Sequence, residues 1–167
     1  MAQTAQYIVQ DNLVKIVDML NQLFAEEWLA YYQYWIGAKV VAGPMRPDIV
    51  DEFMEHANQE LDHANKLADR IIQLGGTPVL NPEDWMRIAK CRYEAPTEAC
   101  TTQVLKQNLT AERCAVSHYQ QLCVLCNGID YVTLRLAEKI LKEEVEHEQE
   151  IEDFIQDIEL TGKCHAE

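Results

Sequence analysis

The sequence predicts an all-α fold, a bundle of four long helices with a long crossover between the second and the third. Apolar residues recur at alternating steps of three and four over four long segments, whereas the pattern of strands is rare. Glycine and proline separate the segments, and neither residue continues a helix. The links within each helix pair are short and the link between the pairs is long, so each pair should be antiparallel.

Each element can be placed from these breaks. The expected helices span about 8–41, 47–74, 82–91, 101–126 and 130–160. The third of these is a short extra helix within the crossover. The segment "NGID" ends the helix over 101–126, and Asp130 is expected to cap the last helix. A chain of 167 residues is long enough for one sizeable core, so we expect a single domain over 1–167.

The composition excludes several classes of function. The chain has 14 basic and 28 acidic residues, a formal net charge of −14, which repels phosphate backbones and disfavours nucleic-acid binding. An excess of carboxylates suits either solubility or the binding of hard cations. No run of about 18 apolar residues argues for a membrane span, and the first residues lack the pattern of a signal peptide. We therefore expect a cytoplasmic protein whose six cysteines are reduced.

Titratable residues occupy helix positions that normally bury leucine. The first and third long helices each carry one glutamate in the apolar stripe, and the second and fourth each carry the motif ExxH. The six positions are Glu27, Glu60, His63, Glu112, Glu144 and His147. The stripes contain no lysine or arginine, and a buried carboxylate without a partner is very costly. The pattern therefore calls for another source of positive charge.

An internal repeat strengthens this reading. The segments "EWLAYYQY" (27–34) and "ERCAVSHY" (112–119) both place alanine three residues and tyrosine seven residues after a glutamate. An ExxH follows each of them at nearly the same distance. A lone ExxH on a helix is usually surface decoration, whereas two in matching positions predict two equivalent helix pairs around one site.

The donor set is that of a dinuclear carboxylate site. One glutamate on each of two helices plus ExxH on each of the other two is the ligand set of di-iron bundles. Two divalent ions would balance four carboxylates, with Glu60 and Glu144 bridging them. Oxygen and imidazole donors admit iron, manganese or zinc.

Other residues near the predicted site are expected to have either a structural role or a role at the site. Tyr34 and Tyr119 are either core aromatics or, as we expect, hydrogen-bond donors to a ligand glutamate of another helix. His56, one turn before the first ExxH, is either an accessory ligand or gate, or a structural histidine. Gln59 and Glu143 each precede an ExxH glutamate and are expected to orient the ligand histidines across the bundle.

Over essentially its whole length the chain resembles the ferritin superfamily. The six site residues match the ferroxidase centre of bacterioferritin one for one, and Tyr34 matches a tyrosine beside that centre. Bacterioferritin has a haem-ligating methionine where this chain has Leu61, so no haem is expected. Only 20 residues follow His147, too few for the fifth helix of bacterioferritin. The short helix around "PEDWMRIAK" is instead a feature of Dps, a mini-ferritin cage of twelve subunits.

A bacterioferritin-like site in a Dps-like body is typical of the Dps-like, or thioferritin, proteins. That resemblance implies a redox pair of cysteines near the site, here Cys91 of the crossover with Cys114; the alternative is that both are small buried hydrophobic residues. Cys100 also lies in the crossover. The "CVLC" motif formed by Cys123 and Cys126 lacks the βαβ context of a redox motif and continues a core stripe.

The resemblance implies a ferroxidase that stores iron and protects against oxidative stress. It would oxidise two Fe(II) ions per subunit with hydrogen peroxide, or less well with O2, in a dodecameric homo-oligomer. Alternatives are a 24-subunit haem-free iron store and a rubrerythrin-like peroxidase without storage. DNA compaction is disfavoured by the charge, and an oxygenase acting on an organic substrate stays open.

Overall fold

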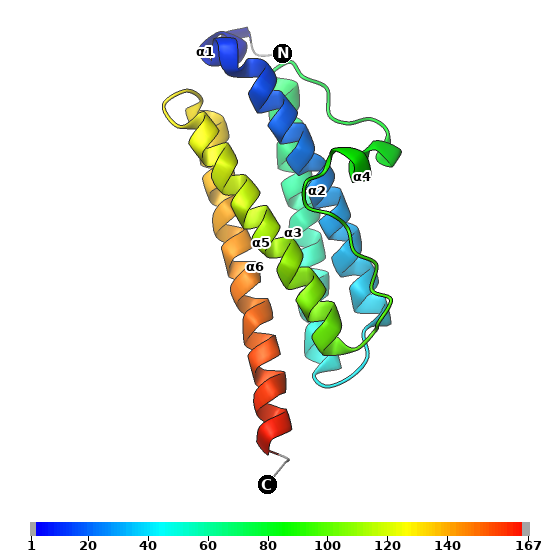
Figure 1. Cartoon of the computed structure of the whole chain (residues 1–167). Coiled ribbons are helices and arrows are strands. Elements are labelled where there is room, and N and C mark those ends of the chain that lie inside the picture. Colours follow the sequence, from blue (N-terminus) through cyan, green and yellow to red (C-terminus); the bar gives the residue numbers. More distant parts are fainter. Residues whose placement is uncertain (1–2, 165–167) are drawn as a thin grey trace.

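The computed structural model describes residues 3–164, and four long helices form its bundle. They are α2 (Leu13–Val40), α3 (Arg46–Gln73), α5 (Thr101–Cys126) and α6 (Tyr131–Cys164). Figure 1 shows α2 beside α3 and α5 beside α6, with the crossover running along the outside of the bundle. The described residues form no strand beyond one isolated bridge. The predicted all-α bundle with a long crossover is confirmed.

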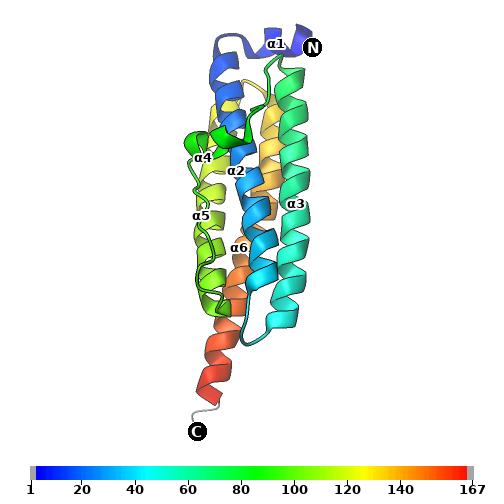
Figure 2. The same ribbon diagram turned by 90° about the vertical axis from the view of Figure 1, so that its right-hand side faces the viewer.

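The N-terminal end differs from the expected continuous helix over 8–41. Here α1 (Gln3–Val9) and the short 3-10 helix η1 (Gln10–Asn12) precede α2, because Gln10 adopts a left-handed backbone conformation with φ of 43°. Figure 2 shows α1 lying across the end of the bundle. The side chain of Gln6 donates a hydrogen bond to the carbonyl of Leu74 at 3.1 Å, which satisfies a free carbonyl after α3. The chain thus turns to cover one end of the core.

The crossover helix is shorter than the expected 82–91. The segment forms η2 (Pro82–Asp84) and α4 (Trp85–Ile88). Beyond α4, the backbone N–H groups of Lys90 and Cys91 donate to Oε1 of Glu26, at 2.7 Å and 3.3 Å. The helix ends early because a carboxylate of α2 takes the donors that another helical turn would use. None of the helices in the described part is long and apolar enough to cross a bilayer.

Two links hold the far end of the crossover to the α2–α3 loop. The N–H of Ala42 donates to the carbonyl of Ala99 at 2.7 Å, and that of Thr101 donates to the carbonyl of Ala42 at 3.0 Å. Gly43 has a φ of 132°, and a Cβ there would lie 2.9 Å from Oγ1 of Thr101. Only glycine fits this turn without strain, so the start of α5 is held against the loop.

The α5–α6 turn is fixed by Asp130. Its carboxylate accepts hydrogen bonds from the N–H groups of Val132 and Thr133 at 3.1 Å and 3.0 Å, which confirms the predicted cap. It also pairs with the buried guanidinium of Arg70 on α3 at 2.8 Å. Burial alone would raise the pKa of Asp130, but the Thr133 and Arg70 hydrogen bonds outweigh it and lower the pKa. One aspartate therefore joins a helix cap to a link between α3 and α6.

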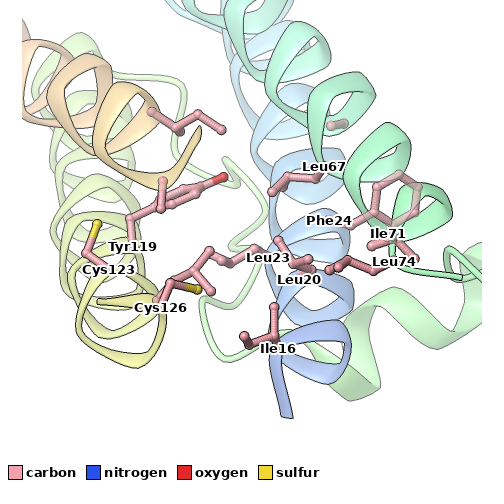
Figure 3. Close-up of a cluster of buried hydrophobic side chains, with 14 of the residues drawn as sticks. Ile16, Leu20, Leu23, Phe24, Leu67, Ile71, Leu74, Tyr119, Cys123 and Cys126 are labelled. Carbon is pink, nitrogen blue, oxygen red and sulfur yellow. The ribbon is translucent and has the colours of Figure 1, made fainter. Parts of the chain in front are cut away.

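The apolar core is divided into two clusters. The large core, most of which is drawn in Figure 3, consists of Val9, Ile16, Leu20, Leu23, Phe24, Ala64, Leu67, Ile71, Leu74, Tyr119, Leu122, Cys123, Cys126, Ala137 and Ile140. The small core consists of Tyr34, Ala38, Val41, Ile49, Phe53, Ala57, Val104, Leu105 and Ile151. On each long helix the six predicted site residues lie between positions of one core and positions of the other. The bundle thus holds a polar layer between two apolar ones.

Candidate metal centre

The polar layer brings six titratable side chains together. They are Glu27 on α2, Glu60 and His63 on α3, Glu112 on α5, and Glu144 and His147 on α6. Each is at most 3% exposed. Helical period alone places a glutamate and the histidine three residues later on one face. Packing of the two antiparallel pairs then brings the four faces together.

The six residues form two overlapping groups of donor atoms. One consists of Glu27, Glu60, His63 and Glu144, and the other of Glu60, Glu112, Glu144 and His147. Within each group the donor atoms all lie within 4.8 Å of one another. Glu60 and Glu144 belong to both groups, which is the arrangement that bridging ligands require.

The distances around each histidine match this division. Nδ1 of His63 lies 3.0 Å from carboxylate oxygens of both Glu60 and Glu144, and 3.5 Å from Glu27. Nδ1 of His147 lies 3.3 Å from Glu60, 3.7 Å from Glu144 and 3.8 Å from Glu112. Each imidazole nitrogen thus faces three carboxylates.

The residues fit a pair of divalent cations. Oε1 of Glu60, Oε2 of Glu112, Oε1 of Glu144 and Nδ1 of His147 are buried without a hydrogen-bond partner. Buried polar atoms normally have partners, and leaving one without costs about 1–3 kcal/mol. Two cations would satisfy these atoms and balance the four carboxylates. Oxygen and nitrogen donors of this kind suit iron, manganese or zinc.

Without cations, the pKa values show that protons carry the positive charge. Burial, together with the negative charge of Glu60, raises the pKa of Glu27 to about 8 and raises that of Glu144 well above its usual value. Burial would likewise raise the pKa of Glu60, but the adjacent imidazoles of His147 and His63 outweigh it and lower that pKa. The cluster is therefore a mixture of protonated and ionised carboxyl groups.

The pKa values of the two histidines are also raised, so both imidazoles are protonated in the absence of cations. Burial would lower the pKa of each imidazole, but the carboxylates around it outweigh burial. Glu144, Glu27 and Glu60 raise the pKa of His63, and Glu112 and Glu60 raise that of His147 to about 11. A protonated imidazole has no lone pair for a metal, so cations must displace these protons.

A second layer of contacts orients both imidazoles. Nε2 of His63 donates to the carboxylate of Glu143 at 2.9 Å, and Nε2 of His147 donates to the side-chain oxygen of Gln59. The predicted contacts of Gln59 and Glu143 across the bundle are confirmed. With Nε2 engaged as a donor, Nδ1 of each imidazole faces the centre, and its lone pair becomes available there once a cation displaces its proton.

Two tyrosines hold the remaining glutamates. The hydroxyl of Tyr34 on α2 donates to Glu112 on α5, and that of Tyr119 on α5 donates to Glu27 on α2. Burial and the nearby carboxylates raise both tyrosine pKa values well above 10, so the hydroxyls stay protonated donors. The tyrosines also belong to the small and the large core respectively, so they combine both of the readings that the sequence allowed.

Cys91 of the crossover and Cys114 of α5 are joined by a disulfide. The expectation that all six cysteines are reduced is therefore wrong for this pair, because the crossover packs against α5 and brings the two sulfurs together. Cys100 is free and exposed, and Cys123 and Cys126 are free and buried in the large core, as Figure 3 shows. The latter two thus continue the core stripe.

Sequence reasoning missed a polar network beside this disulfide. Glu26 accepts hydrogen bonds from the backbone of Lys90 and Cys91 and, at 2.7 Å, from Nδ1 of His118. Nζ of Lys90 donates to Nε2 of His118 at 3.2 Å. The network holds the crossover against the bundle. Its one signal in the sequence is a second glutamate directly before Glu27, which does not reveal its partners.

A small cavity connects the disulfide region with the centre. Its volume is about 30 Å³, roughly that of one water molecule. Cys91 lines it together with Glu27, Glu60, Glu112 and Glu144. A small molecule in this cavity would touch both the carboxylates and the cysteine.

Comparison with known proteins places this geometry in a family. Residues 17–161 match the ferritin-like domain. The chain is 34% identical over 151 residues to the DNA protection during starvation protein of Pyrococcus furiosus, covering 89% of this chain and 78% of that protein. It is 28% identical over 134 residues to the bacterioferritin of Brucella melitensis, covering 80% and 78%.

The structure is similar to a dodecameric thioferritin, the bacterioferritin-related protein from Bacteroides fragilis. The TM-score is 0.96 and the identity 45%, over 98% of both chains. With this match, the ferritin-like domain over most of the chain and the buried carboxylate–histidine layer at its middle, the chain belongs to the ferritin family.

Proposed function

We propose that the protein is a ferroxidase and iron-storing mini-ferritin that consumes hydrogen peroxide in the cytoplasm and so limits oxidative stress. The observation that carries the proposal is the sharing of Glu60 and Glu144 between two buried donor groups. Shared carboxylates hold two Fe(II) ions as neighbouring substrates. Two cations at one site can give one electron each to the same acceptor molecule.

The proposed oxidation of Fe(II) by hydrogen peroxide needs no reductant other than Fe(II) itself. Two Fe(II) ions each lose one electron, and one hydrogen peroxide takes up both electrons and two protons and leaves as two waters. Because both electrons are transferred together, no hydroxyl radical is released. In this proposal the oxidant approaches through the cavity of about 30 Å³ beside Glu27 and Glu112. O2 would be the poorer acceptor in this proposal.

The chain's own residues prepare the site for both cations. Gln59 and Glu143 turn the two imidazole lone pairs inward, and Tyr34 and Tyr119 hold the terminal glutamates. The two apolar cores on either side keep water away from the carboxylates, which strengthens their attraction for cations. We further propose that Cys91 and Cys114 act as a redox pair, since Cys91 lines the same cavity as the carboxylates.

Storage requires a cage, and the dodecameric assembly of the similar Bacteroides fragilis thioferritin supports a twelve-subunit cage here. The native mass of the purified protein should therefore be measured before and after Fe(II) and peroxide are added anaerobically. About twelve subunits that gain a large iron mass would support the proposal. A particle of about 24 subunits would favour a bacterioferritin-type store, and a dimer gaining only about two irons per chain would favour a peroxidase without storage.

The activity itself is tested with Glu60→Ala. Since Glu60 belongs to both donor groups, its loss should abolish rapid Fe(II) oxidation in a stopped-flow measurement. Glu146→Gln, which alters an exposed carboxylate of α6, serves as the control and should oxidise Fe(II) at the normal rate. An unchanged rate in Glu60→Ala would refute the assignment of the centre.

A further inference from the structure

The Cys91–Cys114 disulfide lies between two cavities. Cys91, on the crossover, is 8% exposed and lines the small cavity beside the carboxylates of the centre, the inner cavity. Cys114, on α5, lines an outer cavity of about 400 Å³ between the crossover and α5. Arg92 and Tyr93 line both cavities, so the two cavities adjoin at the disulfide. Each sulfur is therefore reached from a different side.

The outer cavity gives a thiol from solution access to Cys114. This residue follows Glu112 by two positions, which is about 200° around α5, so the thiol and the ligand carboxylate lie on opposite faces of the helix. A thiol that enters the outer cavity meets the sulfur of Cys114 first, and the sulfur of Cys91 is then the one that leaves. Reduction of the disulfide thus frees a thiol that lines the inner cavity.

Positively charged and acid–base groups surround Cys91. Donor atoms of Cys91, Glu26 and His118 all lie within 4.8 Å of one another, and all three residues are buried. Nζ of Lys90 lies 3.2 Å from Nε2 of His118, and Arg92 lines the inner cavity. Neither Lys90 nor Arg92 forms an ion pair with a carboxylate in the part of the chain that the structure describes. Cations beside a cysteine favour its thiolate, which is the nucleophilic form.

The negative charge of Glu26 does not cancel this effect. Its carboxylate accepts hydrogen bonds from the backbone N–H groups of Lys90 and Cys91 and from Nδ1 of His118. Three donors take up that charge and hold the crossover in place. The unpaired charges of Lys90 and Arg92 are therefore available to a thiolate at Cys91.

The second cysteine is in place to react with the first. The Cα atoms of Cys91 and Cys114 lie 5.6 Å apart, so the two sulfurs can be joined or separated without backbone movement. A thiolate stabilised by cations, with a second thiol in reach, is the arrangement that peroxide oxidises reversibly. The pair therefore has the parts of a complete redox cycle.

We propose that Cys91 and Cys114 form a second catalytic site, a thiol peroxidase that reduces hydrogen peroxide with electrons from a small dithiol and needs no metal. The proposal rests on the redox pair of the proposed function and is independent of the dinuclear centre. Cys91 is the residue that reacts with peroxide, and Cys114 is the residue that receives electrons from the dithiol. Arg92 stabilises the thiolate of Cys91.

The cycle has three steps. The sulfur of Cys91 attacks one oxygen of hydrogen peroxide, the O–O bond breaks, and the leaving hydroxide takes the proton of the thiol and departs as water. The sulfur of Cys114 then attacks the resulting sulfenic acid of Cys91, so the S–S bond forms, the S–O bond breaks and a second water leaves with the proton of Cys114. A dithiol attacks Cys114 and, in two exchanges, restores both thiols and becomes a cyclic disulfide. One peroxide and one dithiol give two waters and one disulfide.

The test is the rate of peroxide consumption by the full-length protein, freed of metal and kept in chelator, with dithiothreitol as the reductant. The rate above that of dithiothreitol alone should be lost in Cys91→Ser. Arg92 is exposed, so Arg92→Gln leaves the core intact, and it should lower the rate by about tenfold because less thiolate is present. Cys100→Ser, which removes the free and exposed cysteine of the crossover, is the matched control and should keep the wild-type rate.

The sulfenic acid gives a second readout that does not depend on turnover. In Cys114→Ser, reduced and then freed of dithiothreitol, one equivalent of peroxide should leave a sulfenic acid that has no partner. Dimedone, which reacts with sulfenic acids, should then label Cys91, and peptide mass spectrometry locates the label. The wild type should form the disulfide instead. Absence of the label from Cys91 in this variant would overturn the assignment of Cys91.

The outcomes separate this proposal from the proposed function. Peroxide consumption by the metal-free wild type no faster than that of Cys91→Ser would overturn the thiol peroxidase, and Fe(II) oxidation would be unaffected by that result. Thiol-dependent consumption by a protein that does not oxidise Fe(II) would support the thiol peroxidase and overturn the ferroxidase alone. A wild-type rate in Arg92→Gln would overturn the role given to Arg92.

Discussion

The two halves of the candidate metal centre have the same donor set, but different residues contact their histidines. In one half His63 and Glu27 face the shared glutamates, and in the other His147 and Glu112 do. The carboxylate of Glu143 accepts from Nε2 of His63, whereas the neutral amide of Gln59 accepts from Nε2 of His147.

This difference teaches that the internal repeat does not make the halves equivalent. A carboxylate acceptor makes an imidazole more basic and a better donor to a cation than an amide does. His147 also stacks on the ring of His56. We therefore expect the His63 half to hold its cation more tightly, and the His147 half to exchange its cation more readily.

The largest effect should come from removing a shared ligand. Glu144→Ala removes a donor from both halves, whereas Glu112→Ala removes one from the His147 half alone. We expect Glu144→Ala to lose both tight Co(II) ions, with affinities falling by more than about 100-fold, and Glu112→Ala to keep one. Anaerobic Co(II) titration measures both. One tight ion retained in Glu144→Ala would contradict the assignment of Glu144 as a bridge.

The pH dependence of cation binding is the next largest effect. At pH 7 the raised pKa values keep both histidines and Glu27 protonated in the metal-free protein, with His147 at about 11 and Glu27 at about 8. Loading displaces these protons, so affinity rises with pH. With about three protons released below pH 8, the product of the two binding constants should rise about 1,000-fold per pH unit.

Proton release during Co(II) addition, followed in a pH-stat, checks this expectation. The first cation should release more protons than the second if it enters the His63 half, because Glu27 also loses its proton there. Binding without proton release would contradict the protonation states assigned to the metal-free centre.

A smaller change should follow from exchanging the supports of the histidines. Glu143→Gln gives His63 an amide acceptor, and we expect it to weaken the tighter Co(II) ion by about tenfold. Gln59→Glu gives His147 a carboxylate and should strengthen the weaker ion. The double exchange should reverse the order of the two affinities. Unchanged affinities in both single variants would show that the shared glutamates alone determine them.

The smallest effect should come from the tyrosines. Tyr119→Phe removes the hydrogen bond to Glu27, and Tyr34→Phe removes the one to Glu112, so each should affect one half. The loss of one hydrogen bond amounts to about 1 kcal/mol, or about fivefold in the affinity of that half. Differential Co(II) titration of the two variants measures it. Equal effects on both ions in either variant would argue against separate roles.

Much of the centre could be predicted because helical period is a local property. Steps of three and four place Glu60 with His63, and Glu144 with His147, on one face of a helix whatever surrounds it. The absence of lysine and arginine from those stripes then leaves metal or protons as the compensating charge. Gln59 and Glu143 could be predicted as supports for the same reason, since each directly precedes an ExxH glutamate.

The fold was predictable at the level of helices and less so at their ends. The left-handed residue Gln10 interrupts an apolar stripe that continues on both sides of it. The crossover helix stops at Ile88 because Glu26, far away in sequence, accepts the next backbone donors. Helix ends depend on which polar groups find partners across the fold, and periodicity does not contain that information.

The sequence by itself determined the four amphipathic helices, the crossover between their pairs and the six polar positions facing inward, because these follow from local period and chain breaks. Only the tertiary structure decided how the two donor groups overlap, which acceptor supports each histidine, and that Glu150 of α6 meets His56 of α3. The physical reason is that the helical period alone fixes which side chains share one face of a helix. Which residues of a neighbouring helix they meet depends on the register in which the two helices pack.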